Sequence, residues 1–301
     1  MVKSEKLNAW ATIFRLGNNI GGVIGVFLGA IMALGEMPNG NLLLITSLQA
    51  LSVFSFMSSW NALNDYLDFD IDKVGKPDRP LPSGIISISE AKIGILSMML
   101  ISLSSISGAA FFASHSNEGL YQWLPSAAIW IVALFLLMNY ESSSTYSLNL
   151  KNRGLPGNIA ISASVAMVVL LGSSGVYKIT NARVISIAVI GFLYNLSREI
   201  IKDVQDMESD IGRNTLAKRL GAEKTRIIAY LISLMALISI ISPFALGLFK
   251  ESYLIFTVPS IFVLLMVKTK LANAQDFEAQ QLLKKSLYLC AGAFLLCSLI
   301  I

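Results

Sequence analysis

Two short clusters of polar side chains have the spacing and the chemistry of a metal site. Asn64, Asp68 and Asp72 recur at intervals of four residues, and Asp206 and Asp210 have the same interval. Residues four apart lie on one face of an α-helix, so each cluster would present its carboxylates together. Like charges at this interval destabilise even an exposed helix by about 0.2–0.5 kcal/mol per pair. We therefore expect each cluster to bind something cationic.

Three interpretations of the clusters are open on the residues alone. The first is a pair of solvated helix ends in which the charge has no special role. The second is the ion site of a transporter, although such acids normally lie near the middle of the bilayer in broken helices. The third is Mg²⁺, which prefers oxygen ligands and usually joins one or two carboxylates to substrate phosphates. The third is favoured, because two Mg²⁺ ions would suit two acidic helix ends and would neutralise a diphosphate leaving group.

Basic residues accompany both clusters, as a phosphate ligand would require. Lys73, Lys76 and Arg79 follow the first cluster, and Arg198 and Lys202 precede Asp206. Arginine makes paired hydrogen bonds to phosphate oxygens, whereas lysine acts as a point charge. The alternative role for these cations is to anchor the chain to lipid headgroups, and for Lys73, Lys76 and Arg213 the two interpretations are equally open.

The segments that carry the clusters have the composition of membrane helices. The 301 residues are 54% hydrophobic and 14% charged, whereas a soluble domain carries about 25% charged residues. Most of nine uncharged runs reach or approach the roughly 20 residues that a helix needs to cross a bilayer. The runs are 16–35, 37–64, 93–117, 119–140, 154–177, 184–197, 227–249, 252–267 and 286–301. Backbone groups in lipid must bond within their own segment, so we expect an all-α protein with nine transmembrane helices.

Small residues in the first uncharged run could serve substrate tails or helix packing. Four glycines lie there: Gly21, Gly22, Gly25 and Gly29. Packing is the favoured interpretation, because small residues let the backbones of membrane helices approach closely.

The distribution of basic residues orients the predicted helices. If the amino terminus is cytoplasmic, 20 of the 23 basic residues lie on the cytoplasmic side, and only Lys178, Arg183 and Lys250 lie on the other. This asymmetry follows the positive-inside rule, and it explains the net charge of +4 without a nucleic-acid partner. We expect a multi-pass protein of the cell membrane whose amino terminus and acidic clusters are cytoplasmic.

The remaining side chains of reactive type have ordinary interpretations. The sole histidine, His115, falls in a loop on the face opposite the acidic clusters, so we expect a surface residue and not a catalytic base. Cys290 and Cys297 lie seven residues apart in the last apolar run, and we expect them to pack as small apolar residues. They provide no disulfide framework and no zinc pattern.

The two acidic stretches echo each other along the chain. The second and sixth apolar runs lead into NDYLDFDIDK and REIIKDVQDMESDIGRNT, which lie about 140 residues apart. Such self-similarity is typical of chains built from related units. We expect a single integral membrane domain over residues 1–301, with two cluster-bearing halves of about 1–150 and 151–301.

Four stretches match patterns of one known superfamily. NDYLDFDID (64–72) fits N-D-x-x-D-x-x-x-D, and DMESD (206–210) fits D-x-x-x-D. KPDRPLPSG (76–84) and YSLNLKNRGLPGN (146–158) accompany them. In this order the motifs resemble the UbiA superfamily of intramembrane prenyltransferases, and the other two stretches resemble its cytoplasmic loops. RLGNNIGG (15–22) departs from the RP-x-N pattern expected there, so no role is assigned to Asn18 or Asn19.

The resemblance implies a helix bundle around a central cavity that opens sideways to lipid, with the aspartate motifs at its cytoplasmic end. The implied catalytic residues are Asn64, Asp68, Asp72, Asp206 and Asp210, and the four aspartates among them are the implied Mg²⁺ ligands. The implied substrate contacts are Arg79, Tyr146, Lys151, Lys202 and Asp203. Asp70 lies off the matched positions and Asp65 is assigned a supporting position behind the ligands, so both are given lesser roles.

Within the superfamily, both motif regions are most similar to archaeal enzymes that transfer a geranylgeranyl group to geranylgeranylglyceryl phosphate. This implies Mg²⁺-assisted ionisation of geranylgeranyl diphosphate and attack by the hydroxyl of a lipid-like acceptor, forming the second ether bond of an archaeal membrane lipid. Arg198 would contact the acceptor phosphate. The alternative is an aromatic acceptor, as in quinone or chlorophyll biosynthesis, because those enzymes share the RPLPSG-like tail. A membrane transporter is the interpretation from a different class.

Overall fold

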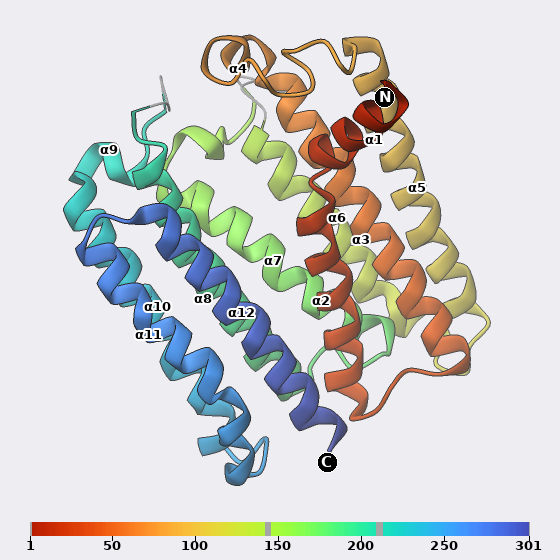
Figure 1. Ribbon diagram of the computed structural model, residues 1–301. Helices are drawn as coiled ribbons and strands as arrows, with labels where there is room; N and C mark the ends of the chain where they lie inside the picture. Colours follow the sequence, from red (N-terminus) through yellow and green to blue (C-terminus); the bar gives the residue numbers. More distant parts are fainter. Residues whose placement is uncertain (1, 142–145, 209–212, 301) are drawn as a thin grey trace. The chain divides into compact units, whose positions relative to one another are not determined.

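The computed structural model describes residues 2–141, 146–208 and 213–300, which form helices and loops with no strand in these ranges (Figure 1). The helices are α1 (Val2–Ile13), α2 (Leu16–Leu34), α3 (Gly40–Leu67), α4 (Phe69–Gly75), α5 (Ile88–Ser114), α6 (Gly119–Glu141), η1 (Leu150–Asn152), α7 (Leu155–Gly175), α8 (Ala182–Gln205), α9 (Leu216–Leu220), α10 (Ala222–Ala245), η2 (Glu251–Thr257), α11 (Val258–Ala272) and α12 (Asp276–Leu299). The prediction of an all-α protein is confirmed.

Nine helical segments within the described ranges are long and apolar enough to cross a membrane. They are α2, α3, α5, α6, α7, α8, α10, the continuous segment Glu251–Ala272 and α12. The predicted number is confirmed, but several segments extend into charged sequence, and α8 and α12 extend furthest. Helix α8 continues to Gln205, beyond the uncharged run that ends at 197, and α12 begins at Asp276, before the run that begins at 286.

Pairing accommodates the charges at these two helix ends. On α8, Arg198 donates to Glu199 at 2.7 Å. At the start of α12, Asp276 accepts two hydrogen bonds from Arg226 of α10, at 2.8 and 2.6 Å. An acid in the first turn also interacts favourably with the helix dipole. The length of an uncharged run therefore underestimates a helix whose ends carry paired charges.

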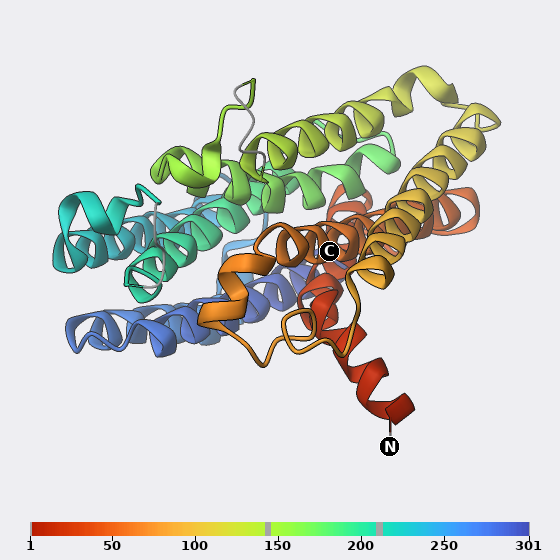
Figure 2. The same ribbon diagram turned by 90° about the horizontal axis from the view of Figure 1, so that it is seen from above.

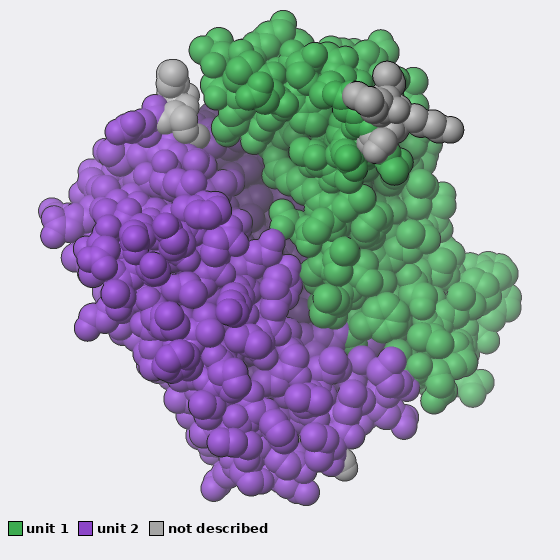
Figure 3. Space-filling view, in the orientation of Figure 1, with its two compact units in different colours: residues 1–27, 38–124, 175–177 green, residues 28–37, 125–174, 178–301 purple. Residues whose placement is uncertain are grey.

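The chain divides into two compact units, which Figure 3 colours separately. Unit 1 comprises residues 1–27, 38–124 and 175–177, and unit 2 comprises residues 28–37, 125–174 and 178–301. The first acidic cluster belongs to unit 1, and Asp206 belongs to unit 2. The predicted halves of about 1–150 and 151–301 stay a prediction.

In unit 1, α3 packs along α5, and the two faces of α5 differ. Ser52 of α3 donates to the carbonyl oxygen of Ser102 at 3.0 Å on the buried face of α5, whereas Ile93 and Leu100 are exposed. Lipid tails are as apolar as leucine, so an exposed apolar helix face suits contact with lipid. His115, which follows α5, is exposed, as predicted for a surface residue.

The end of unit 1 that carries the acidic cluster has its own apolar core. Its buried members are Ala9, Ile13, Phe14, Ala62, Leu81, Ile86 and Ala91. They come from α1, the break after it, the end of α3, the loop after α4 and the start of α5, which meet at this end (Figures 1 and 2). The core therefore fixes the loop that follows the first motif.

In unit 2, α8 packs against α10 and α12, and α11 packs against α12. The Tyr194 hydroxyl of α8 lies 2.6 Å from Ser286 Oγ and 3.2 Å from Ser260 Oγ, so it joins α8 to α12 and α11. Hydroxyl contacts of this kind stabilise helix association in membranes by about 1 kcal/mol each. Cys290 and Cys297 are buried free thiols on α12, which confirms their predicted packing role.

The predicted close packing at glycines is confirmed at two positions of α2. In unit 1, a Cβ atom on Gly22 would lie 2.6 Å from Met57 Sδ of α3. In unit 2, a Cβ atom on Gly29 would lie 1.9 Å from the carbonyl oxygen of Val169 of α7. Any side chain at Gly29 would force the two backbones apart, so glycine is required there.

Candidate functional site

The first acidic cluster spans the junction of α3 and α4. Helix α3 ends at Leu67 and α4 begins at Phe69, and Asp68 between them has φ −84° and ψ 6°. The backbone N–H of Asp68 donates to the Asn64 carbonyl at 2.9 Å, and that of Asp72 donates to the Asp68 carbonyl at 2.8 Å. The four-residue spacing is therefore helical across the junction, as predicted.

Burial divides the four acids of this stretch into two groups. Asp65 and Asp72 are 7% and 5% exposed, whereas Asp68 is half-buried and Asp70 is exposed. A buried carboxylate is destabilising unless it is paired with a cation and hydrogen-bonded. Asp65 and Asp72 must therefore have built-in counter-ions, and Asp70 needs none.

Two arginines supply those counter-ions. Arg15 Nη2 donates to Asp65 Oδ1 at 2.9 Å, and Arg79 Nη1 donates to Asp72 Oδ2 at 2.5 Å and to Asp65 Oδ1 at 3.4 Å. Asp65 is thus the shared acceptor that joins the two arginines. Asp65 belongs to the motif pattern but was given a lesser role, and Arg15 was missed; the available signal was that Arg15 is the last charge before the first uncharged run.

Asn64 links Arg15 to Asp68. Arg15 Nη2 lies 3.3 Å from Asn64 Oδ1, and Asn64 Nδ2 lies 3.4 Å from Asp68 Oδ2. Both hydrogen bonds are long. Their directions are fixed, because a guanidinium can only donate to the Asn64 oxygen and a carboxylate can only accept from the Asn64 nitrogen. The predicted residues Asn64, Asp68, Asp72 and Arg79 therefore lie together in unit 1.

The loop after α4 positions Arg79 through its backbone and its apolar side chains. The Arg79 N–H donates to the Lys76 carbonyl at 3.1 Å, and the Ser83 N–H donates to the Arg79 carbonyl at 2.9 Å. Gly84 has φ +77°, a conformation that glycine adopts without a Cβ clash. Leu81 is 3% exposed in the apolar core at this end of unit 1. The KPDRPLPSG stretch therefore forms a fixed turn.

The second acidic cluster begins at the end of α8. The helix ends at Gln205, and the N–H of Asp206 donates to the Lys202 carbonyl at 2.9 Å. Asp206 is half-buried and Lys202 is exposed. Asp210 lies outside the described residues, so the spacing within this cluster stays a prediction.

Asp203, one turn before Asp206, is held from α7. Asn158 Nδ2 donates to Asp203 Oδ2 at 2.9 Å, and Asn158 is 7% exposed. A Cβ atom on Gly157 would lie 2.4 Å from the Leu150 carbonyl oxygen, so a glycine is needed for the turn that brings Asn158 to Asp203. The GLPGN stretch was singled out from the sequence, but Asn158 itself was missed.

Two other predicted substrate contacts in unit 2 are paired with glutamates, and a third is exposed. Lys151 Nζ donates to Glu141 at 2.8 Å, with side-chain exposures of 11% and 6%, and Arg198 pairs with Glu199. The Tyr146 residue is 98% exposed. The substrate roles of Lys151, Arg198, Lys202, Asp203 and Tyr146 stay predictions.

The oxygen donors within each unit fit Mg²⁺ that is bound together with a phosphate-bearing substrate. Across residues 2–141, 146–208 and 213–300, no three His, Cys, Asp or Glu side chains are grouped so that they could hold a metal alone. Mg²⁺ seldom uses such an all-protein cage; it takes one or two carboxylates and completes its shell with water and phosphate oxygens. Asn64 and Asp68 offer oxygen ligands on successive turns in unit 1, and Asp206 offers another in unit 2.

Comparison with known proteins gives a family model and relatives of similar length. The model described as the UbiA prenyltransferase family matches residues 22–295. The digeranylgeranylglyceryl phosphate synthase of Thermococcus gammatolerans is 31% identical over 308 residues, which cover 98% of this chain and 99% of that protein. The synthase of the same name from Korarchaeum cryptofilum is 31% identical over 291 residues, covering 94% of this chain and 95% of that protein.

Solved structures have the same fold. A structure of digeranylgeranylglyceryl phosphate synthase matches with a TM-score of 0.71 at 24% identity, covering 99% of this chain and 100% of that chain. A UbiA homologue from Archaeoglobus fulgidus bound to GPP and Mg²⁺ matches with a TM-score of 0.63 at 17% identity, covering 97% of this chain and 100% of that chain. The fold predicted from the motifs is confirmed.

Proposed function

We propose, from the premise that this chain belongs to the UbiA prenyltransferase family, that it is a Mg²⁺-dependent geranylgeranyltransferase. Its donor is geranylgeranyl diphosphate, its acceptor is geranylgeranylglyceryl phosphate, and its product carries the second ether bond of archaeal membrane lipids. The observation that carries the proposal is the 31% identity, over 98% of this chain, with the synthase of Thermococcus gammatolerans. The GPP and Mg²⁺ bound to the Archaeoglobus fulgidus homologue support the donor class and the cofactor.

The proposed reaction breaks one carbon–oxygen bond and forms another. The bond between C1 of the geranylgeranyl group and the diphosphate oxygen breaks, and the diphosphate leaves with the electron pair. The hydroxyl oxygen of the acceptor bonds to C1, and its proton passes to solvent. When bound, Mg²⁺ neutralises the charge on the diphosphate.

The acidic clusters are the proposed ligands of the metal. Asp68, Asp72, Asp206 and Asp210 hold Mg²⁺ through their carboxylates, and Asn64 supplies a neutral oxygen. Mg²⁺ prefers these hard oxygen donors. Asp72 is buried and paired with Arg79, and Asp68 is half-buried and lies 3.4 Å from Asn64 Nδ2.

Arg79 has a second role in this proposal. Its guanidinium donates to Asp72 at 2.5 Å, and its side chain is 33% exposed. Arginine forms paired hydrogen bonds to phosphate as readily as to carboxylate. We infer that Arg79 exchanges Asp72 for diphosphate oxygens, which leaves the Asp72 carboxylate for the metal. The further proposed substrate contacts are Tyr146, Lys151, Lys202 and Asp203 for the diphosphate, and Arg198 for the acceptor phosphate.

The chain is a multi-pass membrane protein. We propose that its amino terminus and both acidic clusters are cytoplasmic, because 20 of its 23 basic residues then lie on the cytoplasmic side. We also propose a single prenyltransferase domain over residues 1–301 with two motif-bearing halves, which the match of the family model to residues 22–295 supports.

The proposal is tested by supplying purified protein with geranylgeranyl diphosphate and one acceptor at a time. We expect the ether product and free diphosphate only with geranylgeranylglyceryl phosphate, and only while Mg²⁺ is present. Turnover with an aromatic acid and none with the glyceryl phosphate lipid would contradict the acceptor. Solute uptake into proteoliposomes without release of diphosphate would contradict the transferase activity.

A further inference from the structure

The chain breaks between α1 and α2 at a residue with an unusual backbone conformation. Helix α1 ends at Ile13, α2 begins at Leu16, and Arg15 between them has φ +51°. A residue with a side chain rarely adopts the left-handed region unless its surroundings hold it there. The direction of the Arg15 side chain therefore depends on what holds the break.

Side chains of α2 and α3 hold the break from one side. The break leaves the Phe14 carbonyl to accept from Asn19 Nδ2 at 2.8 Å and from Asn61 Nδ2 at 3.2 Å. Asn19 Nδ2 also lies 2.8 Å from Ser58 Oγ, and Asn61 Nδ2 lies 3.2 Å from Asn19 Oδ1. Asn19 is fully buried. The break is thus tied to the same helix that carries Asn64 and Asp68.

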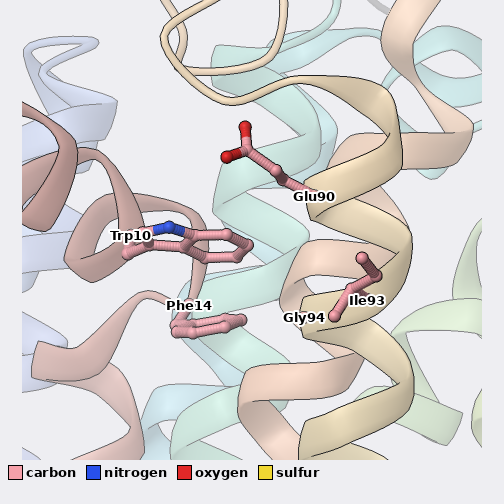
Figure 4. Close-up of a pocket in the computed structure, with 5 residues that line it drawn as sticks. All are labelled: Trp10, Phe14, Glu90, Ile93 and Gly94. Atoms are coloured by element: carbon pink, nitrogen blue, oxygen red, sulfur yellow. The ribbon is translucent and has the colours of Figure 1, made fainter.

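Helix α1 is docked on α5 from the other side (Figure 4). The indole of Trp10 lies against Gly94, where a Cβ atom would be 2.6 Å from Trp10 Cζ3. Trp10 and Phe14 lie with ring centroids 4.9 Å apart and line a pocket of about 220 Å³ with Gly94. Lys6 and Glu90 form an ion pair at the same docking surface. These contacts fix α1, and the break after it, within unit 1.

Arg15 leaves this break toward the first acidic cluster. Its Nη2 donates to Asp65 Oδ1 at 2.9 Å and to Asn64 Oδ1 at 3.3 Å. A guanidinium can only donate, so the Asn64 amide must turn its oxygen toward Arg15 and its nitrogen away. That nitrogen lies 3.4 Å from Asp68 Oδ2. Arg15 therefore favours one orientation of the Asn64 amide, and in that orientation Asn64 contacts Asp68.

We propose that Arg15 is a positioning residue for the metal ligands of the first motif, acting through Asn64 on Asp68 while Asp65 holds its guanidinium. The inference rests on the proposed function, in which Asp68 binds the metal. Outer partners of metal ligands typically change metal affinity or activity by about 10- to 100-fold. Arg15→Met removes both contacts of the guanidinium. Arg15→Lys keeps a cation for Asp65 but removes the guanidinium, whose Nη2 makes both contacts.

The test is Mn²⁺ binding to purified full-length protein in the presence of inorganic diphosphate, followed by electron paramagnetic resonance, because Mn²⁺ takes the same oxygen ligands as Mg²⁺ and the metal is expected to bind with a phosphate group. We expect Arg15→Met to weaken Mn²⁺ binding by about 10-fold or more, with Arg15→Lys between it and wild type. Arg226→Met is the matched control, because Arg226 forms a two-bond pair with Asp276 in unit 2. It should bind Mn²⁺ like wild type.

A double-variant comparison tests the route through Asn64. In the Asn64→Ala background, adding Arg15→Met should change Mn²⁺ affinity far less than it does in wild type, because its intermediary is gone. Wild-type affinity in Arg15→Met, an equal loss in Arg226→Met, or absence of Mn²⁺ binding to wild type would each overturn the inference.

The transfer assay separates this inference from the proposed function. Wild-type protein that binds Mn²⁺ and transfers no prenyl group refutes the function and leaves the role of Arg15 standing. In active protein, Arg15→Met should raise the Mg²⁺ concentration needed for half-maximal rate and leave the KM for the acceptor unchanged. An unchanged Mg²⁺ requirement in active protein overturns the role of Arg15 alone.

Discussion

The Asp65→Asn substitution tests the charge arrangement around the first motif. It keeps the shape of the side chain and removes the negative charge that Arg15 and Arg79 share at 2.9 and 3.4 Å. Arg15 would then have a neutral acceptor only, and Arg79 would keep Asp72. The substitution would therefore leave the Arg15 guanidinium without a carboxylate partner.

The size of the effect follows from burial. Removing one partner of a fully buried pair destabilises a protein by about 3–5 kcal/mol, whereas an exposed pair contributes about 0–1 kcal/mol. Asp65 is buried, but the Arg15 and Arg79 side chains are 34% and 33% exposed, so water solvates part of the charge left behind. We expect the free energy of unfolding to fall by about 2 kcal/mol, between those limits.

The measurement is thermal unfolding in detergent followed by tryptophan fluorescence, because Trp10 and Trp60 lie in unit 1. A loss of about 2 kcal/mol corresponds to a Tm lower by about 3 °C for a chain of 301 residues. The control is Asp70→Asn, at an exposed acid on α4, which should leave Tm unchanged. In an Arg15→Met background the effect of Asp65→Asn should shrink, because the two residues are in contact. Equal Tm values for Asp65→Asn and Asp70→Asn would refute the reasoning.

Three further outcomes follow from packing. Gly29→Ala should lower stability by about 1–3 kcal/mol or more, because its Cβ would lie 1.9 Å from a backbone oxygen of α7; the readout is the temperature at which buried thiols react. Cys290 and Cys297, which are 1% and 0% exposed, should not react with a thiol reagent until the protein unfolds, and labelling of folded protein would contradict their placement. Gly94→Val should displace Trp10 and, like Arg15→Met, weaken Mn²⁺ binding. Unchanged Mn²⁺ binding would show that the docking of α1 on α5 does not affect the metal ligands.

The membrane helices could be predicted because lipid imposes a simple rule on the sequence. A segment without charges and long enough to cross must be helical, and the nine uncharged runs correspond to nine apolar helical segments in the described ranges. The rule fails at helix ends where charges are paired. Asp276 begins α12 because Arg226 of α10 neutralises it, and Arg226 lies 50 residues away in the sequence.

The site was predictable where its geometry is local. The spacing of Asn64, Asp68 and Asp72 survives in the structure because backbone hydrogen bonds continue across the junction of α3 and α4. The partners were not predictable from spacing. Arg15 reaches Asp65 from the break between α1 and α2, and the conformation of this break depends on tertiary hydrogen bonds to Phe14.

The same limit applies to unit 2. Asp203 lies close to the second motif, and its partner Asn158 is 45 residues away on α7. A pattern of acids predicts that a cation will bind, because like charges need an opposite charge. The pattern does not say which amide or arginine orients each acid, since that depends on how the helices pack.

The most direct test of the central claim compares Asp68→Asn with Asp70→Asn in the transfer of a geranylgeranyl group from geranylgeranyl diphosphate to geranylgeranylglyceryl phosphate. Asp68→Asn should lower kcat by at least about 100-fold, because a direct metal ligand should matter more than the residues that hydrogen-bond to ligands, whose loss typically changes activity by about 10- to 100-fold. Asp70→Asn, at an exposed residue, should leave kcat unchanged. Removal of Mg²⁺ with a chelator should stop both the wild type and Asp70→Asn. Wild-type rates in Asp68→Asn, or transfer that continues without Mg²⁺, would contradict the assignment of this cluster as the metal–diphosphate site.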